Sequence, residues 1–470
     1  MSISGKTLVD WGLKPGRWFP EAIESANAVL AKGGDEAAAR QEAERFAPAP
    51  AVGLRAPGAV GYSVNMTPGG EDEIDNLAKV EAHMAELMRV PTIVAGAIMP
   101  DACPSGYQRG TIPVGGVVAA KEAIHPGMHS ADICCSMAVT TFGKDTDATA
   151  LLDAGMRLSH FGGGGRASAA QIKPASALLE RFAGNPFLRQ FESEAIGHHA
   201  TQGDGNHFFY VGRVASSGEV ALVTHHGSRA PGARLYKAGM AVAEKFREQL
   251  SPETAPHNAW IPSETREGED YWSALQIIRE WTRSNHYAIH DMVADALGLQ
   301  RRERFWNEHN FVFRKTDGLF YHAKGATPAY DGFASDTNGL TLIPLNMAEP
   351  ILIARGLDAP NGLGFSPHGA GRNFSRTHFM KRNASRTARD LIAEQAPGID
   401  VRYFCGIPDV SELPLAYKNA ASMRRQIDDF GLAGVVDTIE PIGNIMAGDW
   451  QREAPWRKKK GAVSLPTEEP

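Results

Sequence analysis

Apolar residues recur along much of the chain at a helical spacing, which predicts several amphipathic helices. The clearest helix runs from Trp272 to Val293, where the apolar side chains share one face. Residues 73–89 have the same periodicity, and the alanine- and glutamate-rich segment 21–46 predicts one or two surface helices. Short continuous apolar runs predict buried strands at Thr92–Met99, Val114–Ala120, Met137–Phe142, His207–Val211 and Val220–Thr224.

The order of these elements predicts the fold class and the domain boundaries. Helices and strands do not alternate as βαβ units, so we expect an α+β fold. A Pro-Gly-Gly break at 68–70 follows a mixed N-terminal region, and we therefore separate residues 1–75 from a main domain over 76–450. The charged, proline-bearing residues 451–470 predict a flexible tail.

Composition narrows the expected location and the kind of partner. The net charge is -6, so a nucleic-acid ligand would need a local basic patch. No run of 18 apolar residues occurs, and the first residues lack the apolar core of a signal peptide. We therefore expect no membrane span, a cytoplasmic protein, and four cysteines that are free for metal binding or packing.

Histidine, cysteine and aspartate occur in five short fragments, four of which contain glycine or asparagine, at strand ends or loops where sites are commonly built. A single histidine is more often structural than a ligand, but five such fragments favour a site. Asp132 and Cys135 have a spacing that lets a carboxylate and a thiolate reach one centre from a turn, whereas Cys134 is expected to be a small buried residue. Together with imidazole, these ligands suit Mn, Fe, Co or Zn. The fragments are DICCSM (132–137), GDGNHFFYVG (203–212), THHGSRA (224–230), NEHNF (307–311) and PHGAGR (367–372).

The segment 368–389 contains six Arg or Lys residues and no acid. Its Gly-Ala-Gly step lets backbone N–H groups approach an anion, and a helix beginning there would point its positive end at a phosphate. Arg372 and Arg376 would share one face of that helix. A neutral His368 could attack a nucleotide phosphate. The simpler alternative is a solvated basic helix.

Two residues outside this segment are further candidates for phosphate contacts. Arg229 offers a planar cationic fork beside the Ser228 hydroxyl. Lys324 is equally consistent with an ordinary surface lysine. No P-loop or dinucleotide-binding glycine motif is present.

Taken in order, these fragments resemble the RtcB family of RNA-splicing ligases over residues 75–450. The resemblance implies an RtcB-like fold, with mixed β-sheets flanked by helices around a central metal cleft, and makes 76–450 the catalytic domain. The family motifs appear here as Pro100-Asp101, Asp132–Cys135, Gly203–Phe208, His225–Arg229, His309-Asn310, Lys324–Ala326, His368–Arg376 and Ala416–Lys418.

The resemblance also implies an RNA ligase, active in RNA repair or tRNA splicing, that depends on manganese and GTP. It would join RNA 3′-phosphate or 2′,3′-cyclic phosphate ends to 5′-hydroxyl ends through a guanylylated His368, and Asp101 matches a carboxylate that acts on the 5′-hydroxyl. Whether an archease-like helper is needed stays open. Two Mn²⁺ ions, bridged by the Cys135 thiolate, would be held by Asp132, Cys135, His207, His225 and His309. The implied nucleotide and phosphate contacts are Asn206, Phe208, Arg229, Lys324, Gly369, Ala370, Gly371, Arg372 and Tyr417.

The chain departs from the family where the guanine base is read. Tyr210 replaces a glutamate that reads the guanine edge, and Ile442–Gly448 has no counterpart of the lysine that contacts the base. Residues 345–348 (Leu-Asn-Met-Ala) replace a Gly-Ser-Met-Gly loop, and Cys103 stands where the family has histidine. We therefore expect the metal and phosphate chemistry to be kept and the guanine selectivity to be altered.

Two other functions stay open on this evidence. The first is a metal-dependent RNA-end phosphoesterase or nucleotidyltransferase that keeps His368 and the metals but does not seal. The second is a non-catalytic RNA-end binding protein, which the complete set of metal ligands disfavours.

Overall fold

The computed structural model describes residues 2–16, 18–47, 51–106 and 108–452. Its helices and strands form an α+β protein, which confirms the predicted class. The chain divides into two compact units, one formed by residues up to Gly53 with Glu248–Pro252, and the other by Leu54–Arg247 with the residues from Glu253 onwards. The boundary at residue 75 stays a prediction, and all but two residues of the predicted tail lie outside the described residues.

The first unit is helical. In α1 (Gly5–Asp10) the N-cap hydroxyl of Ser4 accepts from the Thr7 N–H, and Asp35 caps α3 (Glu36–Glu44) in the same way. With α2 (Phe19–Ala31), the segment 21–46 forms two helices, as predicted. The three helices pack through a cluster of small apolar side chains that includes Leu8, Ala22, Ala26, Ala39 and Ala43.

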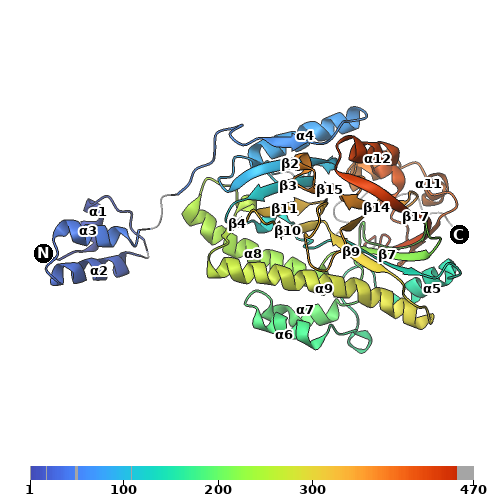
Figure 1. The fold of residues 1–470 in the computed structure, drawn as a ribbon, viewed down its shortest axis with the longest axis horizontal. Coiled ribbons are helices and arrows are strands. Elements are labelled where there is room, and N and C mark those ends of the chain that lie inside the picture. Colours follow the sequence, from blue (N-terminus) through green and yellow to red (C-terminus); the bar gives the residue numbers. More distant parts are fainter. Residues whose placement is uncertain (1, 17, 48–50, 107, 453–470) are drawn as a thin grey trace. The chain divides into compact units, whose positions relative to one another are not determined.

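The second unit contains an eight-stranded sheet that carries most of the site (Figure 1). The main strand order is β13 (Leu340–Ile343), β14 (Ile351–Gly356), β17 (Ala433–Met446), β6 (Phe208–Val214), β7 (Val220–His226), β5 (Ser136–Phe142) and β9 (Arg304–Glu308). The strands β6, β7, β5 and β9 are antiparallel neighbours, so the end of one lies beside the beginning of the next. Off the main path, β16 (Asp400–Tyr403) pairs with β17.

A second, five-stranded sheet completes the walls of the site. Its order is β1 (Tyr62–Val64), β2 (Ile93–Cys103), β3 (Val114–Ala120), β11 (Phe320–Lys324) and β10 (Asn310–Arg314). Two short pairs join β12 (Ala326–Pro328) to β15 (Phe365–Pro367) and β4 (Ala123–Ile124) to β8 (Ile261–Pro262). The five predicted strands are thus confirmed as β2, β3, β5, β6 and β7, with ends that differ by a few residues.

The longest helix, α9 (Arg266–Ala296), is the one predicted from Trp272 to Val293. It begins where the Thr265 hydroxyl accepts from the Gly268 N–H, and it buries Trp281 completely. Figure 1 shows α9 along one side of the strands and α4 along the other. The remaining helices are α4 (Glu71–Leu87), α5 (Ala148–Leu158), α6 (Ser176–Gly184), α7 (Glu192–Gly197), α8 (Arg229–Leu250), α10 (Arg376–Arg382), α11 (Ala388–Gln395) and α12 (Ala420–Asp429).

The expectation of a helix beginning at the His368 loop is wrong. Gly371 has a φ of +71°, which turns the chain out of a helical path, and α10 begins only at Arg376. The preceding Ser375 caps that helix by accepting from the His378 N–H (3.2 Å). Arg372 therefore lies before the helix and shares no helix face with Arg376.

Among the described residues, no helix combines the length and the apolar character that a bilayer crossing requires.

Candidate active site

Four predicted metal ligands meet at one edge of the eight-stranded sheet. His207 and Cys135 immediately precede β6 and β5, whereas His225 lies near the end of β7 and His309 directly follows β9. Because these strands are antiparallel neighbours, all four residues come to the same edge. The backbone also ties two of them together, since the His309 N–H donates to the Cys135 carbonyl oxygen (2.9 Å).

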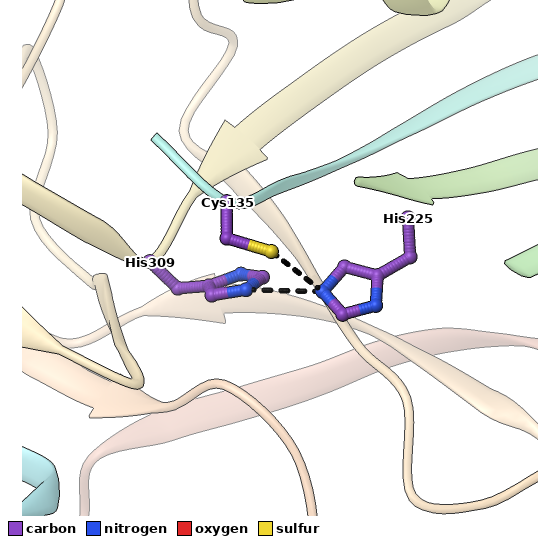
Figure 2. Close-up of side chains that lie close together, drawn as sticks. All are labelled: Cys135, His225 and His309. Atoms are coloured by element: carbon purple, nitrogen blue, oxygen red, sulfur yellow. Dashed lines mark hydrogen bonds between the residues drawn. The ribbon is translucent and has the colours of Figure 1, made fainter. Parts of the chain in front are cut away.

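The ligand atoms of this edge converge on one another (Figure 2). Cys135 Sγ lies 3.2 Å from His225 Nε2, which lies 3.1 Å from His309 Nε2. Cys135 Sγ is also 3.6 Å from His207 Nε2, which is 3.5 Å from Asp132 Oδ2. The five residues thus form two groups of three whose ligand atoms lie within 4.8 Å of one another. Cys135 belongs to both groups, as a bridging thiolate requires.

The chemistry of these side chains fits a metal ion. His225 Nδ1 faces the Asn206 carbonyl oxygen (2.9 Å), which can only accept, so Nδ1 carries the proton and Nε2 presents a lone pair to the cluster. Burial lowers the pKa of His225 to about 3, which keeps the ring neutral. Burial also raises the pKa of the Cys135 thiol well above its usual value, and a nearby cation is what converts such a thiol into a thiolate. Sulfur, imidazole and carboxylate together suit a transition metal.

His368 lies beside the cluster and is held by Asp101. The ring centroids of His368 and His309 are 4.8 Å apart. His368 Nδ1 lies 2.6 Å from Asp101 Oδ2, and the His368 backbone N–H donates to the same oxygen (3.2 Å). The carboxylate accepts a hydrogen bond from the protonated Nδ1, so Nε2 is left with a free lone pair. Because Asp101 is fully buried beneath the ring, this geometry makes it a positioning residue, and its action on a 5′-hydroxyl stays a prediction.

Two glycines let the His368 loop approach its neighbours. Gly371 has a positive φ, and a Cβ atom there would collide with the backbone carbonyl of Asp101. Gly325 also has a positive φ (+63°), and a Cβ atom there would lie 3.0 Å from Cε1 of His368. Both positions therefore require glycine if the histidine is to keep its place.

A cavity of about 310 Å³ joins the metal ligands to the His368 loop. This volume lies within the range of small-molecule sites, about 300–1,000 Å³. Three predicted site residues do not line it: Asp101 lies beneath His368, His207 reaches the cluster beside Cys135, and Arg229 is directed elsewhere. The predicted residues that do line it are Asp132, Cys135, Asn206, Phe208, His225, His309, Lys324, His368, Gly369, Ala370, Gly371, Arg372 and Tyr417.

The two cations predicted outside the His368 loop have different surroundings. Arg229 donates to the carbonyl oxygens of Gly162 and Gly164 (2.9 Å each) and to the Thr201 hydroxyl (2.9 Å), so it holds a loop and is not brought to the cavity. Lys324 does reach the cavity wall, where its Nζ donates to the Ser105 hydroxyl. Burial lowers the pKa of Lys324 to about 8, so its charge is sensitive to pH in the neutral-to-alkaline range.

A buried carboxylate that the sequence analysis missed organises the opposite wall. Glu412 ends a short 3₁₀ helix (Val410–Glu412), and its side chain has no solvent exposure. It pairs with Arg372 (3.2 Å) and Arg376 (2.6 Å), and the Tyr417 hydroxyl donates to it. One carboxylate therefore offsets part of the charge of these two arginines, both of which line the cavity, and their contact with a phosphate stays a prediction.

The remaining wall consists of β6 and β17, where the sequence departs from the family. The Tyr210 hydroxyl donates to the Ile439 carbonyl oxygen (2.8 Å), so its proton is not available to a ligand. Its cross-strand neighbour Asn444 lines the cavity and was not predicted as a site residue. The polar residue in the otherwise apolar run Ile442–Met446 was the available signal.

The protein therefore has an α+β fold and a cluster of side chains that suits a transition metal. Beside this cluster lies a histidine that is hydrogen-bonded to a buried carboxylate. The family model described as "tRNA-splicing ligase RtcB" matches residues 178–447, which is more than half of the chain. The protein therefore belongs to the RtcB family.

Curated relatives with this description share low identity with the chain. The tRNA-splicing ligase RtcB of Aeropyrum pernix is 28% identical over 287 residues, covering 52% of this chain and 58% of that protein. The protein of the same description from Thermococcus kodakarensis is 24% identical over 281 residues, with coverages of 51% and 58%. The RNA-splicing ligase RtcB of Mycobacterium tuberculosis is 24% identical over 280 residues, with coverages of 53% and 64%. The chain thus spans less than two thirds of each of these relatives and is a divergent member of the family.

Proposed function

We propose that this protein is an RNA ligase that joins 3′-phosphate or 2′,3′-cyclic phosphate ends to 5′-hydroxyl ends through a nucleotidylated His368. The observation that carries the proposal is the hydrogen bond from His368 Nδ1 to Asp101, which leaves Nε2 as a nucleophile beside the metal ligands. The descriptions of the relatives, RNA- or tRNA-splicing ligases, support the same reaction. On the family resemblance alone, the nucleotide would be GTP, the metal ion Mn²⁺ and the location cytoplasmic.

The first reaction is the transfer of a nucleotide to His368. The Nε2 lone pair attacks the α-phosphorus of a nucleoside triphosphate, an N–P bond forms, and the bond to the departing pyrophosphate breaks. The ring gains a positive charge, which the buried Asp101 carboxylate stabilises from the Nδ1 side. The protein thus orients the nucleophile and stabilises the charge that develops, and the bonds are made and broken at the α-phosphorus of the nucleotide.

The later reactions move the nucleotide onto RNA and seal the strand. Water first opens a cyclic phosphate to a 3′-phosphate where necessary. An oxygen of that 3′-phosphate attacks the phosphorus on His368, and the N–P bond breaks and returns a neutral ring. The 5′-hydroxyl then attacks the RNA 3′-phosphate, loses its proton, and displaces the nucleoside monophosphate as the new phosphodiester forms.

The residues around the cavity suit the binding of phosphates. Two Mn²⁺ ions held by Asp132, Cys135, His207, His225 and His309 would supply Lewis acidity at the phosphate oxygens. Lys324 places a cation at the cavity wall, and the backbone of the loop Gly369–Gly371 lines the same space.

A labelling experiment tests the nucleotidyl step. The full chain is incubated with Mn²⁺ and each of the four α-³²P-labelled nucleoside triphosphates. We expect a covalent, acid-labile adduct that requires Mn²⁺ and is lost in His368→Ala. The exposed His378, outside the cavity lining, provides the matched control His378→Ala, which should keep the adduct. No adduct with any nucleotide would contradict the proposal.

RNA with defined ends separates sealing from the other functions. Joining of 3′-phosphate to 5′-hydroxyl ends supports the ligase. Opened or capped ends without joined product would instead indicate a non-sealing phosphoesterase or nucleotidyltransferase. RNA binding without any product, unaffected by His368→Ala, would indicate an end-binding protein. The same assay with and without an archease-like protein tests the need for a helper.

A further inference from the structure

Asn444 is a buried amide without a partner inside the cavity. Its residue is 2% exposed, and neither Oδ1 nor Nδ2 has a hydrogen-bond partner. It lies on β17 opposite Tyr210 of β6, and both residues line the cavity. Because an unmet donor and acceptor at a buried position destabilise a protein, this pair of atoms points to a ligand that supplies both groups.

The surroundings of Asn444 form a wall suited to a flat ring. Side chains two residues apart on a strand share a face, so Phe208 and Tyr210 of β6 lie on the same face as their partners Met446 and Asn444 of β17. All four line the cavity, together with the apolar Met347 and Ile351. Aromatic and methionine side chains around a single amide suit a nucleobase, which stacks on apolar groups and presents a polar edge. A ribose has hydroxyls on several sides, and most of them would lack hydrogen-bond partners against a wall that is apolar apart from one amide.

Three other polar side chains that line the cavity already have hydrogen-bond partners. Glu412 is held by Arg372, Arg376 and Tyr417, and the Tyr210 hydroxyl donates to the backbone. Asn346 Oδ1 accepts from the Ala348 N–H (3.0 Å). Among the described lining residues, the other carboxylate is Asp132, which belongs to the metal cluster. Guanine has two adjacent N–H groups on its base-pairing edge, and no free carboxylate remains here to accept from both.

We propose that Asn444 reads the base of the nucleotide and that the chain takes an adenine nucleotide in preference to a guanine nucleotide. An amide offers one donor beside one acceptor, which matches the amino group and ring nitrogen of adenine completely. The same amide can satisfy the carbonyl and one N–H of guanine but leaves its 2-amino group unmet. This inference rests on the proposed function, in which the bound nucleotide is transferred to His368. It replaces the GTP that the family resemblance implies with ATP.

Equilibrium binding tests the preference without requiring catalysis. The full chain, supplied with Mn²⁺, is titrated with the α,β-methylene analogues of ATP and GTP in a calorimeter. We expect the ATP analogue to bind about ten-fold more tightly, as one unmet hydrogen bond implies. In Asn444→Asp, two acceptors face the base, so the preference should reverse towards GTP. In Asn444→Leu, the preference should disappear and both analogues should bind more weakly.

Controls separate this inference from general effects on the fold and from the proposed ligase. Asn338→Asp makes the same chemical change at an exposed residue outside the cavity lining and should leave the preference unaltered. Thermal melting identifies any Asn444 variant that fails to fold, and Asn444→Leu then serves where the buried charge of Asp is not tolerated. Tighter binding of the GTP analogue, equal binding of both, or a preference that neither Asn444 variant changes would overturn the inference. An Asn444-dependent preference without a His368 adduct would instead count against the ligase and leave the inference standing.

Discussion

Two walls of the cavity are built around the same strand, β6, and differ in their chemistry. Just before β6, His207 lies close to Cys135, which also lies close to His225, and their polar atoms converge. Further along β6, Tyr210 and its β17 neighbour Asn444 line the cavity together with methionine and aliphatic side chains. The first wall uses β7, β5 and β9 as neighbours, whereas the second uses β17. Under the proposed function, phosphate chemistry and base selection would therefore be physically separate, so one could change while the other is kept.

The largest expected effect concerns the positioning of His368. Asp101→Asn keeps the shape of the side chain but no longer holds the Nδ1 proton, so the ring can present N–H instead of a lone pair. We expect the rate of adduct formation to fall by about 10³–10⁴-fold, measured with labelled nucleotide. Binding of Mn²⁺ and of the nucleotide analogues should be unchanged. A wild-type rate would show that the carboxylate does not orient the nucleophile.

At the metal wall, Cys135→Ser should remove the sulfur shared by both ligand groups. Serine is a poor ligand for a transition metal, so we expect Mn²⁺ affinity to fall by at least about 100-fold, measured by calorimetry. The preference between adenine and guanine analogues should not change, because Asn444 lies on the other wall. Cys405, a free cysteine outside the cavity lining, supplies the control Cys405→Ser. Equal metal affinity in both variants would show that Cys135 is not a metal ligand.

The arginines of the His368 loop depend on a buried charge. Glu412→Gln should leave Arg372 and Arg376 without their shared counter-ion, and we expect unfolding free energy to fall by about 3 kcal/mol in urea titrations. The exposed pair of Glu394 with Arg386 is the matched control. Glu394→Gln should cost less than about 1 kcal/mol. Similar losses in both variants would contradict a special role for Glu412.

Lys324 makes phosphate binding sensitive to pH. Because burial lowers its pKa from 10.5 to about 8, its charge is present below pH 8 and is lost as the pH rises through that value. We expect binding of the nucleotide analogues to weaken by about ten-fold between pH 7 and pH 9, one charge-assisted contact being lost, and Lys324→Arg to be much less sensitive. The unfolded chain holds this proton up to about pH 10.5, so this group makes the folded state more stable as the pH rises between the two values. A pH profile that Lys324→Arg leaves unchanged would assign the effect elsewhere.

The smallest expected effect comes from Tyr210→Phe. The variant loses one hydrogen bond to the Ile439 carbonyl oxygen, and we expect a loss of about 1 kcal/mol in unfolding free energy. The ratio of the two nucleotide affinities should stay the same, because the hydroxyl is bonded to the backbone. A changed ratio would mean that Tyr210, and not Asn444 alone, contacts the base.

Much of this arrangement could be predicted from the sequence, but only where a short sequence motif indicates it. The five predicted metal ligands stand in short motifs, most of them beside strand ends, and the structure brings all five together where the motifs indicated a centre. The prediction of a helix at the His368 loop was wrong because Gly371 adopts a left-handed conformation, which the basic residues around it did not indicate. Glu412 could not be assigned to Arg372 and Arg376 because the contact joins residues 40 and 36 positions apart.

The four predicted ligands at the sheet edge also affect the stability of the folded protein. Cys135 and His225 are 90 residues apart in sequence, and His225 and His309 are 84 apart, so only the assembled sheet presents them together. An ion bound there acts as a removable cross-link between strands and is lost when the chain unfolds. Each ten-fold excess of free metal over its dissociation constant adds about 1.4 kcal/mol to the folded state. If a metal ion binds there as proposed, its supply would also govern resistance to proteolysis.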